Sequence, residues 1–251
     1  MLPVCQLLLE NIQDKNPKDK MDKTPFHYAA QNGHFKVCQL IMRNIKNKDK
    51  SPKDQCGGTP LHLAADKDHF NICQLLIKNV KDKNPKNNIG LTPLHYAVEK
   101  GHFEICRLII NNVKNKNPKD NEPMRGQTPF HTAAEKGYFS ICQLIIENVE
   151  NKCPKDVWGN TPLHIAVARN HFSICKLIIE CIEDKNPKNR GGITPLHQAA
   201  MFGHLQIFQF ILENVNDITP KCKSRKTPLD YAIANGHDVI ASLLKSAMER
   251  S

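Results

Sequence analysis

The feature that most constrains the fold is a Thr-Pro pair that recurs through almost the whole chain at a nearly constant interval. Successive pairs are separated by 35, 33, 36, 33, 33 and 33 residues. The pairs begin at Thr24, Thr59, Thr92, Thr128, Thr161, Thr194 and Thr227. A repeat of this length predicts a solenoid, in which each unit buries its apolar face against its neighbours.

Each repeat carries the local signals of two short helices, as in NPKNNIGLTPLHYAVEKGHFEICRLIINNV. Thr92 is a good helix N-cap, and Pro93 suits the first helical position, where its missing N–H costs nothing. Gly101 can take the left-handed conformation that ends this helix, and its replacements Asp68 and Asn170 tolerate that conformation best. The second helix is apolar over a broad face. Neither helix is long enough to be stable alone, so stacking must supply the burial.

The motif TPLHxAAxxGH, followed by an apolar helix and preceded by a Gly-containing turn, resembles the ankyrin repeat. It is clearest in residues 59–69, 92–102 and 161–171. The resemblance covers nearly the whole chain and implies an all-α ankyrin-repeat solenoid of stacked helix-turn-helix units. Projecting hairpin loops, the fingers, would line a concave face. The loop after the second helix departs from the family pattern and reads N-V-x-x-K-N-P-K-D, which leaves the geometry of that edge open.

The two ends of the chain differ from the inner repeats. We predict a single array over residues 1–251, with a partial first repeat in 1–18, because VCQLLLENI matches a second helix without a first. Residues 19–251 would form seven repeats. Lys245 falls where inner repeats carry isoleucine, so we expect the last repeat to be a C-terminal cap. A start in mid-repeat suggests a fragment of a larger protein or an incomplete gene model.

Cysteine usage and charge indicate a reducing compartment and a basic surface. The net charge of +10 favours acidic partners or a lysine-rich soluble surface. Six cysteines recur at one position of the second helix and are expected to be small buried hydrophobes. These are Cys5, Cys38, Cys73, Cys106, Cys142 and Cys175. The others, expected to be surface thiols, are Cys56, Cys153, Cys181 and Cys222.

The chain carries no recognisable targeting or membrane segment. Its first residues, MLPVCQLLLENI, lack the basic region and the cleavage site of a signal peptide. No run approaches the roughly 18 apolar residues of a membrane helix, so no membrane insertion is expected. We predict a cytoplasmic protein, with the nucleus as the alternative compartment.

All twelve histidines fall at two repeat positions, which leaves none as a catalytic candidate outside the pattern. Six lie in TPxH, where the resemblance implies hydrogen bonds between neighbouring repeats, and six open the second helix. His102 and Cys106 have a spacing found in metal sites, but packing explains both residues. No nucleophile elbow or phosphate loop is present. We therefore expect no enzymatic activity, no metal and no cofactor.

The candidates for partner recognition are variable residues at the finger tips and on the exposed face of the first helix. The finger candidates are Met21, Lys23, Ile89, Leu91, Met124, Arg125, Trp158, Arg190 and Ile193. The helix candidates are Tyr96, Arg169, Met201 and Phe202. Trp158 could instead brace a finger, and Phe202 could pack between helices. The enlarged finger NEPMR at 121–125 could reach into a partner or be tolerated surface length.

The favoured function is a non-enzymatic protein-binding scaffold or adaptor that acts as a monomer and recognises a protein through its concave face and fingers. One alternative is nucleic-acid binding by a ridge of lysines at Lys46, Lys48, Lys81, Lys83, Lys114 and Lys116. Acidic residues interrupt the ridge and no aromatic platform accompanies it, which disfavours this alternative. A further alternative is a regulatory ankyrin domain of a larger protein.

Overall fold

The computed structural model describes residues 2–45, 50–121 and 125–249. The secondary structure of these residues consists of fifteen helices without a strand, which confirms the predicted all-α class. The described helices include none that is long and apolar enough to cross a membrane. Tertiary contacts group the chain into two compact units, Met1–Glu122 and Pro123–Ser251.

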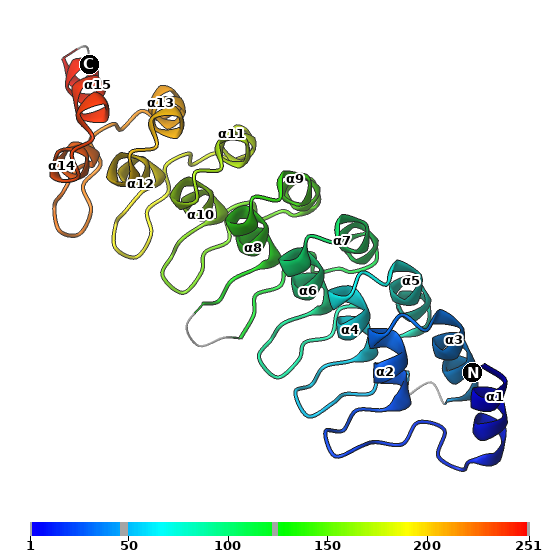
Figure 1. Ribbon diagram of the computed structural model, residues 1–251. Coiled ribbons are helices and arrows are strands. Elements are labelled where there is room, and N and C mark those ends of the chain that lie inside the picture. Colours follow the sequence, from blue (N-terminus) through cyan, green and yellow to red (C-terminus); the bar gives the residue numbers. More distant parts are fainter. Residues whose placement is uncertain (1, 46–49, 122–124, 250–251) are drawn as a thin grey trace. The chain divides into compact units, whose positions relative to one another are not determined.

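The first unit contains three pairs of antiparallel helices and one additional helix (Figure 1). Its helices are α1 (Leu2–Asn11), α2 (Pro25–Gln31), α3 (Phe35–Asn44), α4 (Pro60–Asp66), α5 (Phe70–Asn79), α6 (Pro93–Lys100) and α7 (Phe103–Ile110). The first helices α2, α4 and α6 pack in one row, and the second helices α3, α5 and α7 pack in another. Helix α1 packs against α3, as expected for a second helix.

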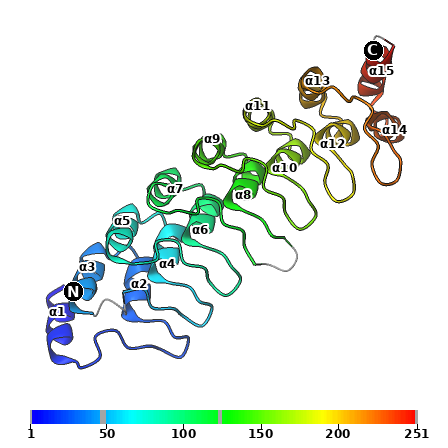
Figure 2. The ribbon, with the colours of Figure 1, turned by 180° about the vertical axis from the view of Figure 1, so that it is seen from behind.

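The second unit repeats the same plan with four helix pairs (Figure 2). Its helices are α8 (Pro129–Lys136), α9 (Phe139–Asn148), α10 (Pro162–Ala168), α11 (Phe172–Cys181), α12 (Pro195–Phe202), α13 (Leu205–Asn214), α14 (Pro228–Ala234) and α15 (Asp238–Met248). In each unit the fingers extend away from the row of second helices, as both views show.

The predicted helix signals are confirmed at the first helix of each pair. Thr92 is the N-cap of α6 in extended geometry, and Pro93 is its first residue. The helix ends at Gly101, whose φ of 76° is left-handed. Asp68 and Asn170 hold the same region with φ of 58° and 60°, as their chemistry predicted.

The histidine of TPxH both caps its helix and bonds to the next repeat. In α4, His62 Nδ1 lies 3.1 Å from the backbone nitrogen of Thr59 and accepts its hydrogen. Because Nδ1 accepts, the neutral ring carries its hydrogen on Nε2, which donates to the Leu91 carbonyl 3.1 Å away. The equivalent bonds join His27 to Gly58, His131 to Asn160, His164 to Ile193 and His197 to Lys226. The link between repeats that the family resemblance implied is confirmed.

Burial keeps these imidazoles neutral. It lowers the pKa of His62 and of His164 to about 4, because the charged form loses its water. Desolvation also lowers the pKa values of His27 and His197. Protonation would add a hydrogen to Nδ1, which would then repel the threonine N–H that it now accepts. The folded state therefore disfavours the imidazolium form.

This depression of the pKa predicts that acid destabilises the fold. The unfolded chain protonates His62 and His164 near pH 6.5 and the folded chain near pH 4, so between these values the unfolded state binds more protons. Their full contribution is present above pH 6.5 and is lost as the pH falls towards 4. We expect urea midpoints, measured between about pH 7.5 and about pH 4.5, to decrease steadily below about pH 6.5. A midpoint that rose or stayed constant over that range would contradict the proposed linkage.

The histidine that opens the second helix makes a bond in the opposite direction. His69 Nε2 lies 3.1 Å from the carbonyl oxygen of Gln31, at the end of the first helix of the preceding repeat. Equivalent bonds join His102 to Asp66, His171 to Glu135 and His237 to Met201. The sequence predicted only that this histidine opens the helix. Adjacent repeats within each unit are therefore joined by two sets of histidines, one pointing forward and one pointing back.

The recurrent cysteines fill the apolar core of the second helices, as predicted, except at the first repeat. Cys38, Cys73, Cys106, Cys142 and Cys175 are buried. Cys5 is only half-buried, and Val4, Leu7 and Leu8 of the same helix α1 are exposed. Burial raises the pKa of the Cys38, Cys106 and Cys142 thiols to about 12. These thiols stay protonated and unreactive at neutral pH.

The prediction of a surface thiol is wrong for Cys222. This residue is buried at the base of the last finger, where its Sγ lies 3.1 Å from Ser224 Oγ and 3.8 Å from the hydroxyl of Tyr231. It stands where other fingers carry Asp or Asn, and its contact with Tyr231 places it against the first helix α14. Cys56 is exposed, and Cys153 and Cys181 are half-buried.

Candidate interaction surface

An Asp or Asn at the base shapes most of the fingers. Asp54 Oδ1 accepts hydrogen bonds from the backbone N–H groups of Cys56, at 3.0 Å, and Gly58, at 2.7 Å. The same pair of bonds recurs at Asp19, Asn87, Asp156 and Asn189. One side chain thereby satisfies two backbone donors and closes the turn. This Asp or Asn, which stands five positions before five of the seven Thr-Pro pairs, was not recognised in the sequence, although its periodicity marks it.

Backbone hydrogen bonds also join consecutive fingers within a unit. The Gln55 N–H donates to the Met21 carbonyl at 3.1 Å, and the Arg190 N–H donates to the Trp158 carbonyl at 2.8 Å. Side chains add to these links, because Gln55 Nε2 donates to Lys20 O and Asn88 Nδ2 donates to Gln55 O. Backbone hydrogen bonds therefore join the finger tips to one another, and the side chains of Met21 and Trp158 remain exposed.

In the first unit the exposed candidates are apolar. Met21 is 53% exposed and Ile89 is 47% exposed, both at finger tips. Lys23 and Leu91 are half-buried. The ammonium of Lys23 lies 5.9 Å from the centre of the Tyr28 ring, a cation–π contact. Met21 and Ile89 thus have the most surface to offer a partner.

Tyr96 has an internal role that the sequence did not indicate. Its hydroxyl lies 3.3 Å from Asn87 Nδ2, and its ring meets that of His62 edge-on with centres 5.5 Å apart. Burial raises its pKa. Tyr28 repeats the arrangement, since its hydroxyl donates to Asp19 at 2.7 Å. A tyrosine at this position fastens the first helix to the base of its finger.

In the second unit the exposed finger candidates are aromatic or positively charged. Trp158 is 48% exposed, while its backbone N–H donates to Asp156 at 2.9 Å. Arg125 and Arg190 are exposed, and Ile193 is half-buried with its carbonyl accepting the bond from His164. Met124 lies outside the described residues. The structure therefore brings Trp158 beside the finger of Arg190.

The helix candidates of the second unit differ in how much of each side chain is available. Phe202 is 46% exposed, with its ring centre 5.8 Å from that of His204. Met201 is half-buried, and its carbonyl accepts from His237. Arg169 Nη2 lies 2.5 Å from Glu135 Oε1, an exposed ion pair that a partner would have to compete with. Phe202 is the most accessible apolar side chain of this group.

The chemistry of the described residues offers packing and hydrogen bonding. Within residues 2–45, 50–121 and 125–249, no three His, Cys, Asp or Glu side chains are grouped so that they could hold a metal ion. Most of the described histidines form helix caps or hydrogen bonds between repeats, as His62 and His69 do. What remains for recognition is a set of exposed side chains on a hydrogen-bonded framework.

Comparison with known families agrees with this architecture. A family model described as ankyrin repeats in three copies matches residues 41–120, 113–189 and 169–250. A model of a single ankyrin repeat matches residues 21–50. Among curated proteins, none matches the chain.

Proposed function

The chain belongs to the ankyrin-repeat family, and from that premise we propose that it is a non-enzymatic scaffold or adaptor that binds a protein partner. Ankyrin repeats are generally protein–protein interaction modules and are typically not enzymes. The proposed contact surface consists of the finger tips and the exposed ends of the first helices. We propose that the protein acts there as a monomer, in the cytoplasm or the nucleus.

The observation that carries this proposal is the exposure of large aromatic side chains on a framework that does not need them. Trp158 and Phe202 each leave nearly half of their surface exposed, at 48% and 46%. At the equivalent position to Phe202 other repeats carry the polar residues Lys100, Lys136 and Arg169. Exposing an aromatic ring to water is unfavourable, and such residues often dominate the energetics of protein interfaces.

A double substitution tests the proposal. We expect Trp158→Ala with Phe202→Ala to weaken capture of partner proteins from cell lysate by about a hundredfold, because each large anchor contributes about 1–2 kcal/mol. Captured proteins would be quantified by mass spectrometry against the wild-type chain. Crosslinking would locate them on the chain.

The matched control removes similar apolar surface elsewhere in the same unit. Phe139 and Val239 are exposed near the starts of the second helices α9 and α15, so Phe139→Ala with Val239→Ala should leave capture unchanged. Equal loss in the two double variants would show that general destabilisation causes the effect. Crosslinks confined to the loops after the second helices would place the partner elsewhere and refute the proposed surface.

A further inference from the structure

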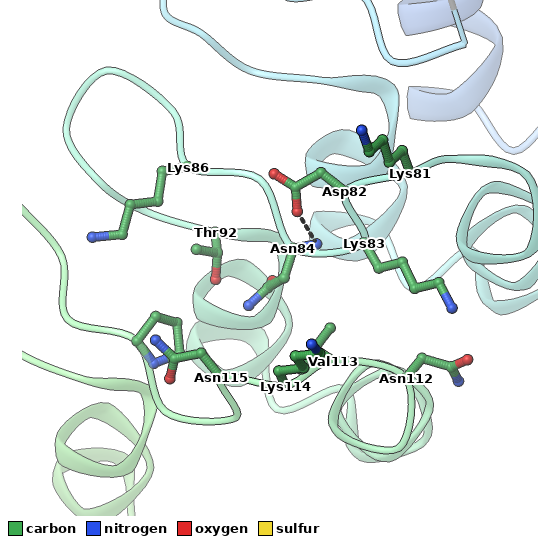
Figure 3. A pocket seen from close by; sticks show the side chains of 11 residues that line it. Lys81, Asp82, Lys83, Asn84, Lys86, Thr92, Asn112, Val113, Lys114 and Asn115 are labelled. Atoms are coloured by element: carbon green, nitrogen blue, oxygen red, sulfur yellow. Dashed lines mark hydrogen bonds between the residues drawn. The ribbon is translucent and has the colours of Figure 1, made fainter. Parts of the chain in front are cut away.

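A groove with a basic lining lies in the first unit, between the loop after α5 and the loop after α7. Its volume is about 440 Å³. Its charged lining residues are Lys81, Asp82, Lys83, Lys86 and Lys114, which give a formal charge of +3. Figure 3 shows Lys81 and Lys83 on one loop and Lys114 on the other. These are the loops that depart most from the family pattern.

Two of the five charged groups are engaged by their neighbours. Lys86 Nζ donates to the Lys119 carbonyl at 2.8 Å, and Asp82 accepts from the backbone N–H of Asn84 at 3.1 Å (Figure 3). Between described residues, no hydrogen bond or ion pair uses the ammonium groups of Lys81, Lys83 or Lys114. Like charges gathered around one hollow repel one another, and an anion in the groove would relieve that repulsion.

The corresponding groove of the second unit has the opposite charge. It has a volume of about 480 Å³ and lies between the loops that follow α11 and α13. Glu183 stands in the place of Lys81, Asn216 in the place of Lys114 and Asp217 in the place of Asn115. Its charged lining residues are Glu183, Asp184, Lys185, Lys188 and Asp217, which give a formal charge of −1. The fold accepts either set of residues, so folding does not require the positive charge of the first groove.

The amide side chains of the basic groove favour a peptide over a nucleic acid. Asn84 Oδ1 accepts from the Leu94 N–H at 3.1 Å, which leaves its NH₂ group as a donor. Asn112 Nδ2 donates to the Leu108 carbonyl at 2.9 Å, which leaves its Oδ1 as an acceptor. A peptide backbone carries both donors and acceptors and can pair with both amides, whereas a phosphodiester offers only acceptors. Among the described residues that line the groove, none is an aromatic on which a base could stack.

We propose that this groove binds an acidic polypeptide segment, whose carboxylates pair with Lys81, Lys83 and Lys114. The asparagine amides hold the main chain of the segment between these ion pairs. The site uses none of the finger or first-helix candidates, so it stands independently of the proposed function. Its ion pairs are exposed, and binding weakens as salt screens them.

The test exchanges the charges of the two grooves in the full chain. The probe is a fluorescent peptide of alternating glutamate and serine, and its binding is followed by anisotropy at low salt. We expect the triple variant Lys81→Glu, Lys114→Asn, Asn115→Asp to bind it roughly tenfold more weakly. These are the residues that the second groove carries at the same positions, so the variant is expected to fold. The reciprocal variant Glu183→Lys, Asn216→Lys, Asp217→Asn should bind additional peptide.

The control changes the net charge by the same amount on exposed helix positions of the first unit. Lys36→Glu with Arg43→Glu, both on the second helix α3, should leave peptide binding within about twofold of wild type, apart from long-range charge effects. Equal loss in the control and the triple variant would show that net charge, and not the groove, attracts the peptide. Failure of the wild-type chain to bind the peptide at low salt would overturn the proposal. So would tighter binding, through the same lysines, of an oligothymidine with an equal number of negative charges.

Discussion

Replacing His164 with alanine is expected to lower the free energy of unfolding by about 4 kcal/mol, which is the largest effect that we predict for a single substitution. The side chain is fully buried. Its Nδ1 lies 3.2 Å from the Thr161 nitrogen, and its Nε2 lies 3.1 Å from the Ile193 carbonyl. Alanine would leave a buried donor and a buried acceptor without partners, and it would also leave a cavity. Urea unfolding followed by circular dichroism would measure the loss.

The single tryptophan provides a local measurement of the same effect. Trp158 lies in the finger that leads into α10, the helix of His164, so its fluorescence reports unfolding near the substitution.

A shorter polar residue at position 164 separates the two roles of the histidine, the helix cap and the bond to the next repeat. His164→Asn can still accept the Thr161 N–H, but its side chain cannot reach Ile193 in the next finger. We expect this variant to lose about half as much stability, because one of the two sets of bonds remains.

A different outcome would assign the stability of the repeat to other contacts. If His164→Ala and His164→Asn were equally destabilised, the cap would contribute nothing and the link to Ile193 would account for the whole loss. If His164→Ala lowered the stability by less than about 1 kcal/mol, the buried hydrogen bonds would not be the main interaction between these repeats.

Gly203→Ala is expected to cost about 3 kcal/mol, the second large effect, because the new methyl group has no space. Gly203 ends α12 with a φ of 72°. A Cβ at this position would lie 2.5 Å from Cε1 of His237, the histidine that donates to the Met201 carbonyl. The ring would have to move, and the bond between the two repeats would be lost with it.

Gly236 supplies a control with the same backbone and free space. Its φ is also 72°, but a Cβ there would meet nothing within 4 Å. Gly236→Ala should therefore cost only the left-handed strain, about 1 kcal/mol. Both variants would be measured by urea unfolding. Equal losses of stability would show that the left-handed backbone conformation alone requires glycine at position 203, and that the His237 ring does not.

The local features of the repeat were predictable because residues close together in sequence produce them. Thr92 and Pro93 mark the start of a helix through their own hydrogen bonding and φ, and Asp68 adopts the left-handed region as its side chain allows. The burial of the recurrent cysteines followed from helical periodicity. The predictions failed where a side chain contacts a residue that does not belong to its own segment. Cys222 is buried beside Tyr231, which lies nine residues further along the chain.

The candidate surface was only partly predictable, for the same reason. A variable residue is identified by comparing the repeats with one another, but whether its side chain can contact a partner depends on which side chains lie near it. Tyr96 is held by Asn87 and His62, and Arg169 is paired with Glu135. Trp158 and Phe202 keep nearly half of their surface exposed. The sequence had already placed Lys81, Lys83 and Lys114 on one basic ridge, but the groove between their two loops was visible only in the structure.

The repeat, its two helices, their caps and the all-α class could all be inferred from the sequence, because short-range hydrogen bonding and periodic burial encode them. The groups that meet across repeats became known only from the folded structure. His69 reaches the Gln31 carbonyl and His62 reaches the Leu91 carbonyl over long separations in sequence, and only stacking sets those distances. The same stacking forms a groove between neighbouring loops in both units, and the residues at equivalent positions, such as Lys81 and Glu183, give the two grooves opposite charge.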